Sequence, residues 1–388
     1  MNFGILTRIA SLITGIVIIL VLPYFLSDQE LQKFYILYAT LPIVAIVDFG
    51  FIAKILSAKS NCEIFNFQTL KLFVSRCLLV GVSSALIIYY LPYSAIADII
   101  FLSPAIIILY SSIVMLAIVE ASVSFETSYK IRFISEISLF IAMIVLCFSK
   151  TPEATSLILL VLAFRSTPAI FYFIFKIDIS MFWNNIKSKK NIISDNFSIK
   201  VGIVSIMGYL SGQATNWIVA FNFSLKEGLA YNQSYFIIST IFSLTMSYLI
   251  YYQVTFKTEG NIYNKYLEIR KIYLTQLCLS FSFLVAVGLG AIFFVNIYIS
   301  VIKFDMITFF LVFTLFFTLI HNHIAAIVFR INGKEILFDL SIISSLFVIF
   351  SFLLIGYYFD SIFVLIINLM IGLIVNFYLT HILVKRRA

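Results

Sequence analysis

The sequence has few charged side chains and no region polar enough to form a soluble domain. Only 11% of its 388 residues are Asp, Glu, Lys or Arg, whereas 62% are hydrophobic and the mean hydropathy is +1.09. Soluble domains carry roughly 25% charged residues, so this chain has too few ions to cover a surface in water. Apolar runs follow one another from Gly4 to Val384, separated by short polar loops. The composition excludes a soluble globular protein and predicts a polytopic membrane protein.

Patterns typical of disulfide frameworks and metal sites are also missing. The four cysteines are scattered and form no C-x-x-C pair. His321 and His323 form an H-x-H pair, but a metal site would need further ligands nearby. We therefore predict no metal and no cofactor, apart from H⁺ or Na⁺ as a coupling ion.

Apolar runs of about 20 residues, the length that crosses a bilayer as a helix, occur twelve times. They predict an all-α polytopic membrane protein with twelve transmembrane helices. The first six are residues 4–26, 35–56, 70–91, 95–121, 131–148 and 155–177. The second six are residues 201–223, 232–256, 272–300, 307–330, 335–358 and 361–383.

The basic residues between these runs predict the orientation. With the N-terminus inside, 21 of the 26 Lys and Arg lie on the cytoplasmic side, and Arg165 is left within a span. Only Lys33, Lys150, Lys226 and Lys303 lie outside. This asymmetry follows the positive-inside rule, so both termini are predicted to be cytoplasmic. It also explains the net charge of +8 without nucleic acid as a partner, because the basic residues follow the loops and do not cluster on one folded face.

The longest internal polar segment divides the chain near its midpoint. We predict an N-terminal six-helix bundle (residues 1–177), a basic cytoplasmic linker (178–200) and a C-terminal six-helix bundle (201–388). The two halves open alike, because Phe25-Leu-Ser-Asp-Gln-Glu follows the first span and Phe223-Ser-Leu-Lys-Glu follows the seventh. Such internal similarity half a chain apart is typical of a duplicated transporter.

Ionisable residues within the spans are the candidates for function, because a charge at mid-bilayer is costly without a partner or an aqueous cavity. Arg165 lies near the middle of the sixth span, just before Pro168. We favour an anion-facing role in a central cavity over a structural ion pair with a buried carboxylate. Asp48, about two-thirds along the second span, and Glu136, about a turn and a half inside the fifth, are candidates for ion coupling or for salt bridges.

Two further groups of residues belong to the predicted site. Arg8 and Arg76 lie one to two turns from the cytoplasmic surface, where snorkelling is the ordinary explanation. Gly208, Ser211, Gly212 and Thr215 form a small-residue stripe on the seventh span, with Gln213 and Asn216 beside it. Such stripes are usually helix-packing faces. Because the first span of each half carries one, we assign Ser211, Gln213 and Asn216 a cavity-lining role.

The two six-helix halves resemble the polysaccharide flippases of the multidrug/oligosaccharidyl-lipid/polysaccharide (MOP) superfamily, in particular the bacterial O-antigen flippases (Wzx). Asp48-Phe-Gly after a Tyr-rich helix start, and Ser27-Asp-Gln-Glu-Leu before that helix, carry the likeness. It implies a protein of the bacterial inner membrane that moves undecaprenyl-diphosphate-linked oligosaccharide to the periplasmic leaflet. Its partners would be that lipid-linked oligosaccharide, membrane lipids and other polysaccharide-assembly membrane proteins. The resemblance assigns Arg165, Arg8, Arg76 and Lys54 to the anionic headgroup, and Asp48 and Glu136 to ion coupling.

Two alternatives remain open. An O-antigen polymerase, ligase or acyltransferase would need catalytic residues on an external loop, and the Asp28/Glu30 pair is the acid and base that such an enzyme would use. The external loops are short, so we predict no enzyme and no catalytic residues. A drug exporter of the same superfamily would share the fold, but an Arg-lined basic cavity favours anionic substrates.

Overall fold

A computed structural model of the chain divides into two compact units, Met1–Tyr209 and Leu210–Ala388, and each is described by itself. In these described parts every regular element is a helix, which confirms the all-α prediction. The described residues are 3–48, 51–57, 64–92, 94–147, 153–177, 216–217, 219–236, 238–239, 267, 271, 275, 307–309, 312–313, 367, 371, 374–375, 378 and 382.

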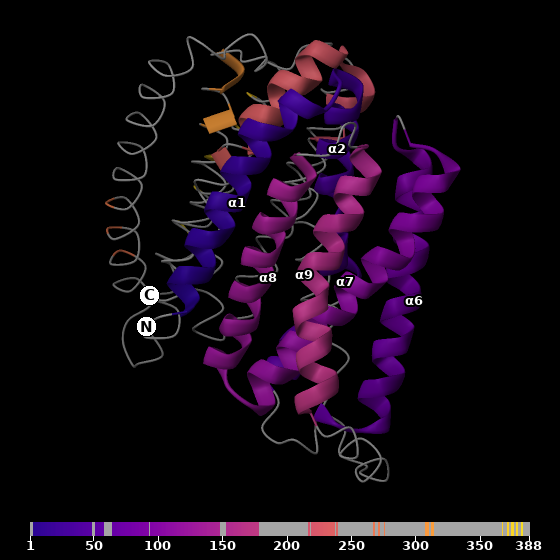
Figure 1. Ribbon diagram of the computed structural model, residues 1–388, viewed down its shortest axis with the longest axis vertical. Helices are drawn as coiled ribbons and strands as arrows, with labels where there is room; N and C mark the ends of the chain where they lie inside the picture. Colours follow the sequence, from indigo (N-terminus) through magenta and orange to yellow (C-terminus); the bar gives the residue numbers. More distant parts are fainter. Residues whose placement is uncertain are drawn as a thin grey trace. The chain divides into compact units, whose positions relative to one another are not determined.

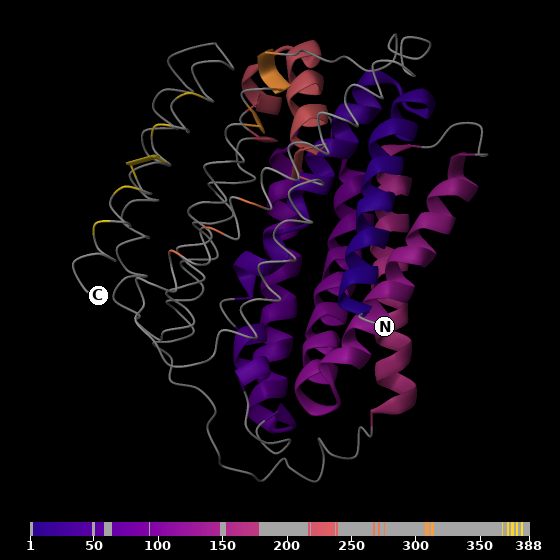
Figure 2. The same cartoon turned by 90° about the vertical axis from the view of Figure 1, so that its left-hand side faces the viewer.

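The N-terminal unit is a bundle of long helices that run side by side (Figure 1). Across the bundle α1 packs on α8, α8 on α9, α9 on α7 and α7 on α6, while α2 packs on α9. Figure 2 shows the long helices lying along one common direction. The elements are α1 (Phe3–Phe25), α2 (Asp28–Thr40), α3 (Ile43–Val47), α4 (Phe51–Ser57), α6 (Phe67–Tyr90), α7 (Ile96–Ser122), α8 (Phe125–Cys147) and α9 (Ala154–Lys176).

Five of the six predicted N-terminal spans correspond to single helices. The bounds of α1, α6, α7 and α9 differ from the predicted ones by at most three residues. Among the described residues, α6, α7 and α9 are both long and apolar enough to cross a membrane. The other predicted spans, from residue 201 on, lie mostly outside the described residues, so the count of twelve stays a prediction.

The second predicted span is not one helix, and this part of the prediction is wrong. The chain from 28 to 57 forms α2, α3 and α4, with turns at Leu41–Pro42 and at Asp48. Proline has no backbone N–H and its ring clashes with the preceding turn, so Pro42 breaks the helix. Asp48 then caps the next segment, because its backbone oxygen accepts from the Phe51 N–H (3.0 Å) and its Oδ2 accepts from the Ile52 N–H (3.0 Å).

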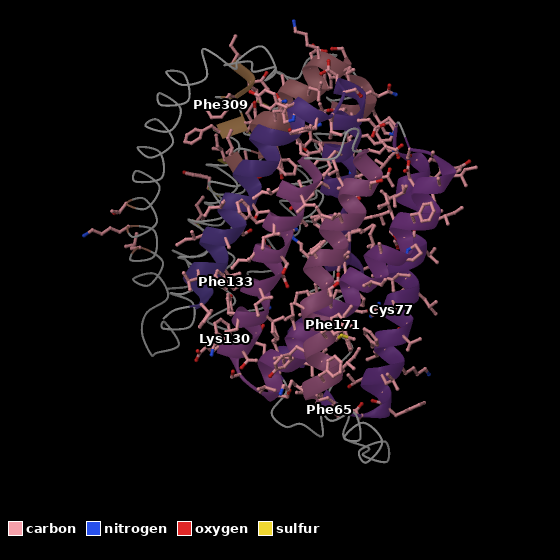
Figure 3. All side chains as sticks on the ribbon, viewed as in Figure 1. Phe65, Cys77, Lys130, Phe133, Phe171 and Phe309 are labelled. Atoms are coloured by element: carbon pink, nitrogen blue, oxygen red, sulfur yellow. The ribbon has the colours of Figure 1, made fainter. Side chains whose placement is uncertain are left out.

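The fifth span begins earlier than predicted. Helix α8 starts at Phe125, where polar residues form its first turns against the N-terminal end of α1. The Thr7 hydroxyl donates to the Tyr129 carbonyl (3.1 Å), and the Phe3 and Phe133 rings meet edge to face with centroids 6.1 Å apart. Figure 3 shows Lys130 and Phe133 on this lower part of α8. The earlier start places Glu136 deeper in the bundle than the sequence indicated.

Candidate functional site at mid-depth in the N-terminal unit

Two ionisable residues occupy the midpoints of neighbouring helices. Glu136 lies eleven residues from each end of α8, and Arg165 lies eleven residues from each end of α9. At 1.5 Å per residue, each is about 16 Å from either helix end, which is half the hydrocarbon thickness of a bilayer. The structure therefore brings together two residues that the sequence analysis had given separate roles.

The contact between them is long. Arg165 Nε lies 3.6 Å from Glu136 Oε1, beyond ordinary hydrogen-bond distance. Glu136 Oε2 and Arg165 Nε are buried and have no hydrogen-bond partner. The guanidinium carbon also lies 5.7 Å from the centre of the Tyr38 ring on α2, within range of a cation–π contact. We call these three residues the Glu136–Arg165 site.

Two buried polar atoms of this site, Glu136 Oε2 and Arg165 Nε, therefore form no hydrogen bond. A buried donor or acceptor without a partner costs about 1–3 kcal/mol, and more when it is charged. The Arg165 side chain is more exposed than that of Glu136, at 28% against 14%, although its Nε is itself buried. A cation at mid-depth needs water or an anion beside it. The Glu136–Arg165 site is therefore the candidate for binding an anionic ligand.

A second polar group surrounds Asp48 at the break between α3 and α4. The Tyr110 hydroxyl on α7 donates to Asp48 Oδ1 (3.0 Å), and the positive charge of Arg76 on α6 acts on the same carboxylate. Asp48 is 4% exposed, and Phe73 stacks on Tyr110 at 6.3 Å. Of the predicted site residues, Asp48 and Arg76 are thus brought together, whereas sequence reasoning missed Tyr110. We call Asp48, Arg76 and Tyr110 the Asp48 cluster.

We expect Asp48→Ala to lose more stability than Tyr110→Phe, because the alanine leaves both the Tyr110 hydroxyl and the Ile52 N–H without their acceptor. Each lost charged hydrogen bond is worth about 1.5–3 kcal/mol. Melting of the detergent-solubilised protein measures the difference. In the double variant the two effects should be less than additive, and full additivity would contradict a direct Tyr110–Asp48 bond.

Sequence reasoning also missed a polar cluster at the end of the unit where α2, α7 and α9 begin. Asp98 Oδ2 lies 2.9 Å from Lys33 Nζ and accepts from the Ala95 N–H (2.6 Å), while Thr155 donates to Asp98 Oδ1. Beside it, Glu30 Oε2 accepts from the backbone N–H of Ala154 (2.8 Å). An acidic residue in the first turn of a helix is the signal that would have identified Asp98. We call Glu30, Lys33, Asp98 and Thr155 the Asp98 cluster.

A matching clamp lies at the opposite end, where α7 ends and α8 begins. Arg132 donates to Glu120 (3.1 Å), and the Ser128 hydroxyl donates to the same carboxylate oxygen (3.2 Å). On the exposed side of α8, Lys130 forms an ion pair with Glu126 (2.9 Å). The hydrogen bond from Lys130 holds the pKa of the Glu126 carboxyl below its usual range.

The other predicted site residues are placed only in part. The backbones of Arg8 and Lys54 belong to α1 and α4, but their side chains, like Ser211 and Gln213, lie outside the described residues. Asn216 is described and buried. Within the described part of the chain, no group of three or more His, Cys, Asp or Glu residues is arranged to hold a metal ion.

The similar openings of the two halves have similar local structures. In the N-terminal unit the Ser27 hydroxyl accepts from the Glu30 N–H (3.3 Å) at the start of α2. In the C-terminal unit the Ser224 hydroxyl accepts from the Glu227 N–H (3.4 Å), and Glu227 accepts from the Ser224 N–H (3.1 Å). This is the reciprocal Ser-x-x-Glu capping box. Glu30 differs because its carboxylate binds α9.

Comparison with known proteins gives a fold but no sequence family. No protein-family model matches the chain, and no curated protein matches its sequence. Solved structures match along the whole chain. An inward-facing multidrug resistance MATE family transporter of the MOP superfamily has a TM-score of 0.66 at 13% identity, covering 100% of this chain and 96% of its own.

The chain has the fold of the MATE transporters. A MATE structure in complex with MaL6 gives a TM-score of 0.63 at 12% identity, covering 100% of this chain and 94% of that one. A MOP superfamily transporter from Pyrococcus furiosus gives 0.62 at 13% identity, with the same coverage of both chains. The MATE fold and the apolar helices together indicate a multi-pass membrane protein.

Proposed function

We propose that the protein is a flippase of the bacterial inner membrane, which moves undecaprenyl-diphosphate-linked O-antigen units from the cytoplasmic to the periplasmic leaflet. The observation that carries the proposal is a cation at mid-depth, Arg165, whose contact with Glu136 is long and whose Nε has no hydrogen-bond partner. A diphosphate carries the negative charge and the paired oxygens that a guanidinium binds best. The headgroup would cross through a polar cavity while its lipid tail stays in the bilayer.

Alternating access is the mechanism that this fold supports. Similar solved structures include one MATE transporter in an inward-facing conformation and one in an outward-facing conformation. In such a cycle an anion bound to Arg165 would be exposed to one side and then to the other. Asp48 and Glu136 are the proposed ion-coupling residues, with H⁺ or Na⁺ as the ion. Membrane lipids and other polysaccharide-assembly proteins are the proposed partners.

A drug exporter of the same fold is the second candidate, since the similar structures include multidrug resistance transporters. The carboxylates of Asp48 and Glu136 are the groups that would attract cationic drugs. The more exposed side chain of the Glu136–Arg165 site is that of the arginine, however, and this favours an anion. Polarity varies within the fold, because the Pyrococcus furiosus transporter has a binding pocket of reverse polarity, which suggests a different function for that protein.

We expect the protein to restore surface O-antigen in a bacterial strain that lacks its own O-antigen flippase and makes a compatible repeat unit. Gel analysis of lipopolysaccharide measures the restoration, and the amount of repeat unit left on the cytoplasmic leaflet gives an independent readout. The same gene is expressed in a strain without multidrug exporters, where survival on cationic dyes is scored. Dye resistance without O-antigen restoration across a panel of repeat units would overturn the flippase proposal and establish the exporter.

A further inference from the structure

The ion pairs of the N-terminal unit differ in how completely they are satisfied. Lys33–Asp98 and Arg132–Glu120 have contacts of 2.9 and 3.1 Å, and each carboxylate also accepts a hydroxyl, from Thr155 or from Ser128. Glu136 and Arg165 are 3.6 Å apart, and each keeps a buried atom without a hydrogen-bond partner. The Lys33–Asp98 and Arg132–Glu120 pairs near the helix ends are short and have an additional hydroxyl donor, whereas the pair at mid-depth is long and has none in the described part of the unit.

Among the described residues of the N-terminal unit, no other ion pair involves Glu136 or Arg165. Helices α1, α2 and α7 pack against α8 or α9, and Tyr38 on α2 is the titratable group that they bring to Arg165. At mid-depth on α7, Tyr110 donates to Asp48. The charged groups of these three helices lie within about two turns of a helix end: Arg8, Asp28, Glu30, Lys33, Asp98 and Glu120. Among the described residues, Glu136 is therefore the anion that pairs with Arg165.

A carboxylate and a phosphate are alternative ligands for one guanidinium, because both offer paired oxygens to the same fork of N–H donors. The phosphate carries more negative charge than the carboxylate. Tyr38 also contacts the guanidinium, both through its ring and through a side-chain hydrogen bond. The weak point of the empty site is thus the Glu136 contact, which an incoming anion replaces.

We infer that Glu136 is an exchangeable counter-ion: it holds Arg165 in the empty transporter and gives it up when a diphosphate headgroup binds. The inference rests on the proposed function and adds a role for Glu136 in both halves of the transport cycle. The bound headgroup replaces Glu136 during translocation. Glu136 replaces the headgroup during the empty return, so that the return does not expose an uncompensated charge at mid-bilayer.

If Glu136 and the diphosphate exchange at Arg165, one substitution should raise the affinity for the diphosphate and lower the turnover. Glu136→Gln removes the competitor for Arg165, so the diphosphate should bind more tightly. The same change leaves Arg165 without a counter-ion in the empty state, so the return step should slow. A residue that only stabilises the fold would lower affinity and turnover together.

The test uses the full-length protein in nanodiscs and farnesyl diphosphate as a soluble probe of the headgroup chemistry. We expect Glu136→Gln to bind the probe at least about fivefold more tightly than the wild type, a modest coupling between two ligands of one site. In proteoliposomes loaded with lipid-linked oligosaccharide, the same variant should show a lower KM and a lower kcat.

Glu126→Gln is the matched control, because it makes the same change on the same helix in an exposed ion pair and should leave binding and transport as in the wild type. Glu136→Asp keeps the carboxylate charge. A change shared by Glu136→Asp and Glu136→Gln would therefore come from folding and not from loss of the charge. If folded Glu136→Gln protein binds farnesyl diphosphate no more tightly than the wild type, the inference is overturned. Binding of the probe by the wild type would still support the proposed function. If the wild type does not bind farnesyl diphosphate but binds the cation tetraphenylphosphonium, the proposed function is wrong, and the inference that rests on it is wrong as well.

Discussion

Arg165→Gln should destabilise the protein and abolish transport, whereas adding Glu136→Gln should restore the stability and leave transport lost. The single substitution leaves the Glu136 carboxylate at mid-depth without a cation, and its Oε2 has no hydrogen-bond partner to compensate. Breaking a buried ion pair by removing one partner typically costs 3–5 kcal/mol. We expect about 3 kcal/mol here, at the lower end of that range, because the pair is long and partly accessible.

The double variant isolates the two roles of Arg165. Replacing both members of a buried pair by neutral groups is often neutral for stability, so the melting temperature should return close to that of the wild type. Surface O-antigen in the complementation assay should stay absent, because no cation remains for the headgroup. Transport by the stable double variant would contradict a substrate-binding role for Arg165 and leave it a structural residue.

Asp98→Ala should reduce the yield of folded protein more than any other single substitution outside the mid-depth site. It removes the partner of Lys33, the acceptor of the Thr155 hydroxyl and the cap on the Ala95 N–H at once. The carboxylate is almost fully buried, with 3% of the residue exposed, and Lys33, whose side chain is 13% exposed, would lose its counter-ion. A loss of about 3–5 kcal/mol follows from the broken pair. Fluorescence-detected size-exclusion chromatography after heating measures it.

Two variants define the cause of that loss. Asp98→Asn keeps an acceptor for the Ala95 N–H but removes the charge opposite Lys33, so its loss should be intermediate. Glu153→Ala changes an exposed acidic residue beside the same cluster, where the side chain makes no capping hydrogen bond, and it should leave the melting temperature unchanged. Equal effects of Asp98→Ala and Glu153→Ala would show that the Asp98 cluster does not hold α2, α7 and α9 together.

The ends of most helices were predictable because a span in lipid has to be apolar and has to form all its backbone hydrogen bonds internally. An apolar run of about 20 residues has to satisfy its backbone internally, so hydropathy alone locates α1, α6, α7 and α9. The break in the second span was harder to predict. Pro42 and Gly50 were visible in the sequence, but a long apolar run outweighed them. The polar start of α8 escaped prediction because packing against α1, rather than lipid, stabilises its first turns.

The composition and the order of apolar runs determined that this protein lies in a membrane and that its function depends on a few buried charges. Arg165, Glu136 and Asp48 were identified because a charge within an apolar run is costly wherever the helix packs. Their partners were decided by tertiary structure alone. Tyr110 is 62 residues from Asp48, and Arg165 meets Glu136 and Tyr38 across two helix interfaces. Hydropathy measures the depth of a residue in the membrane and carries no information on which face of a helix meets its neighbour.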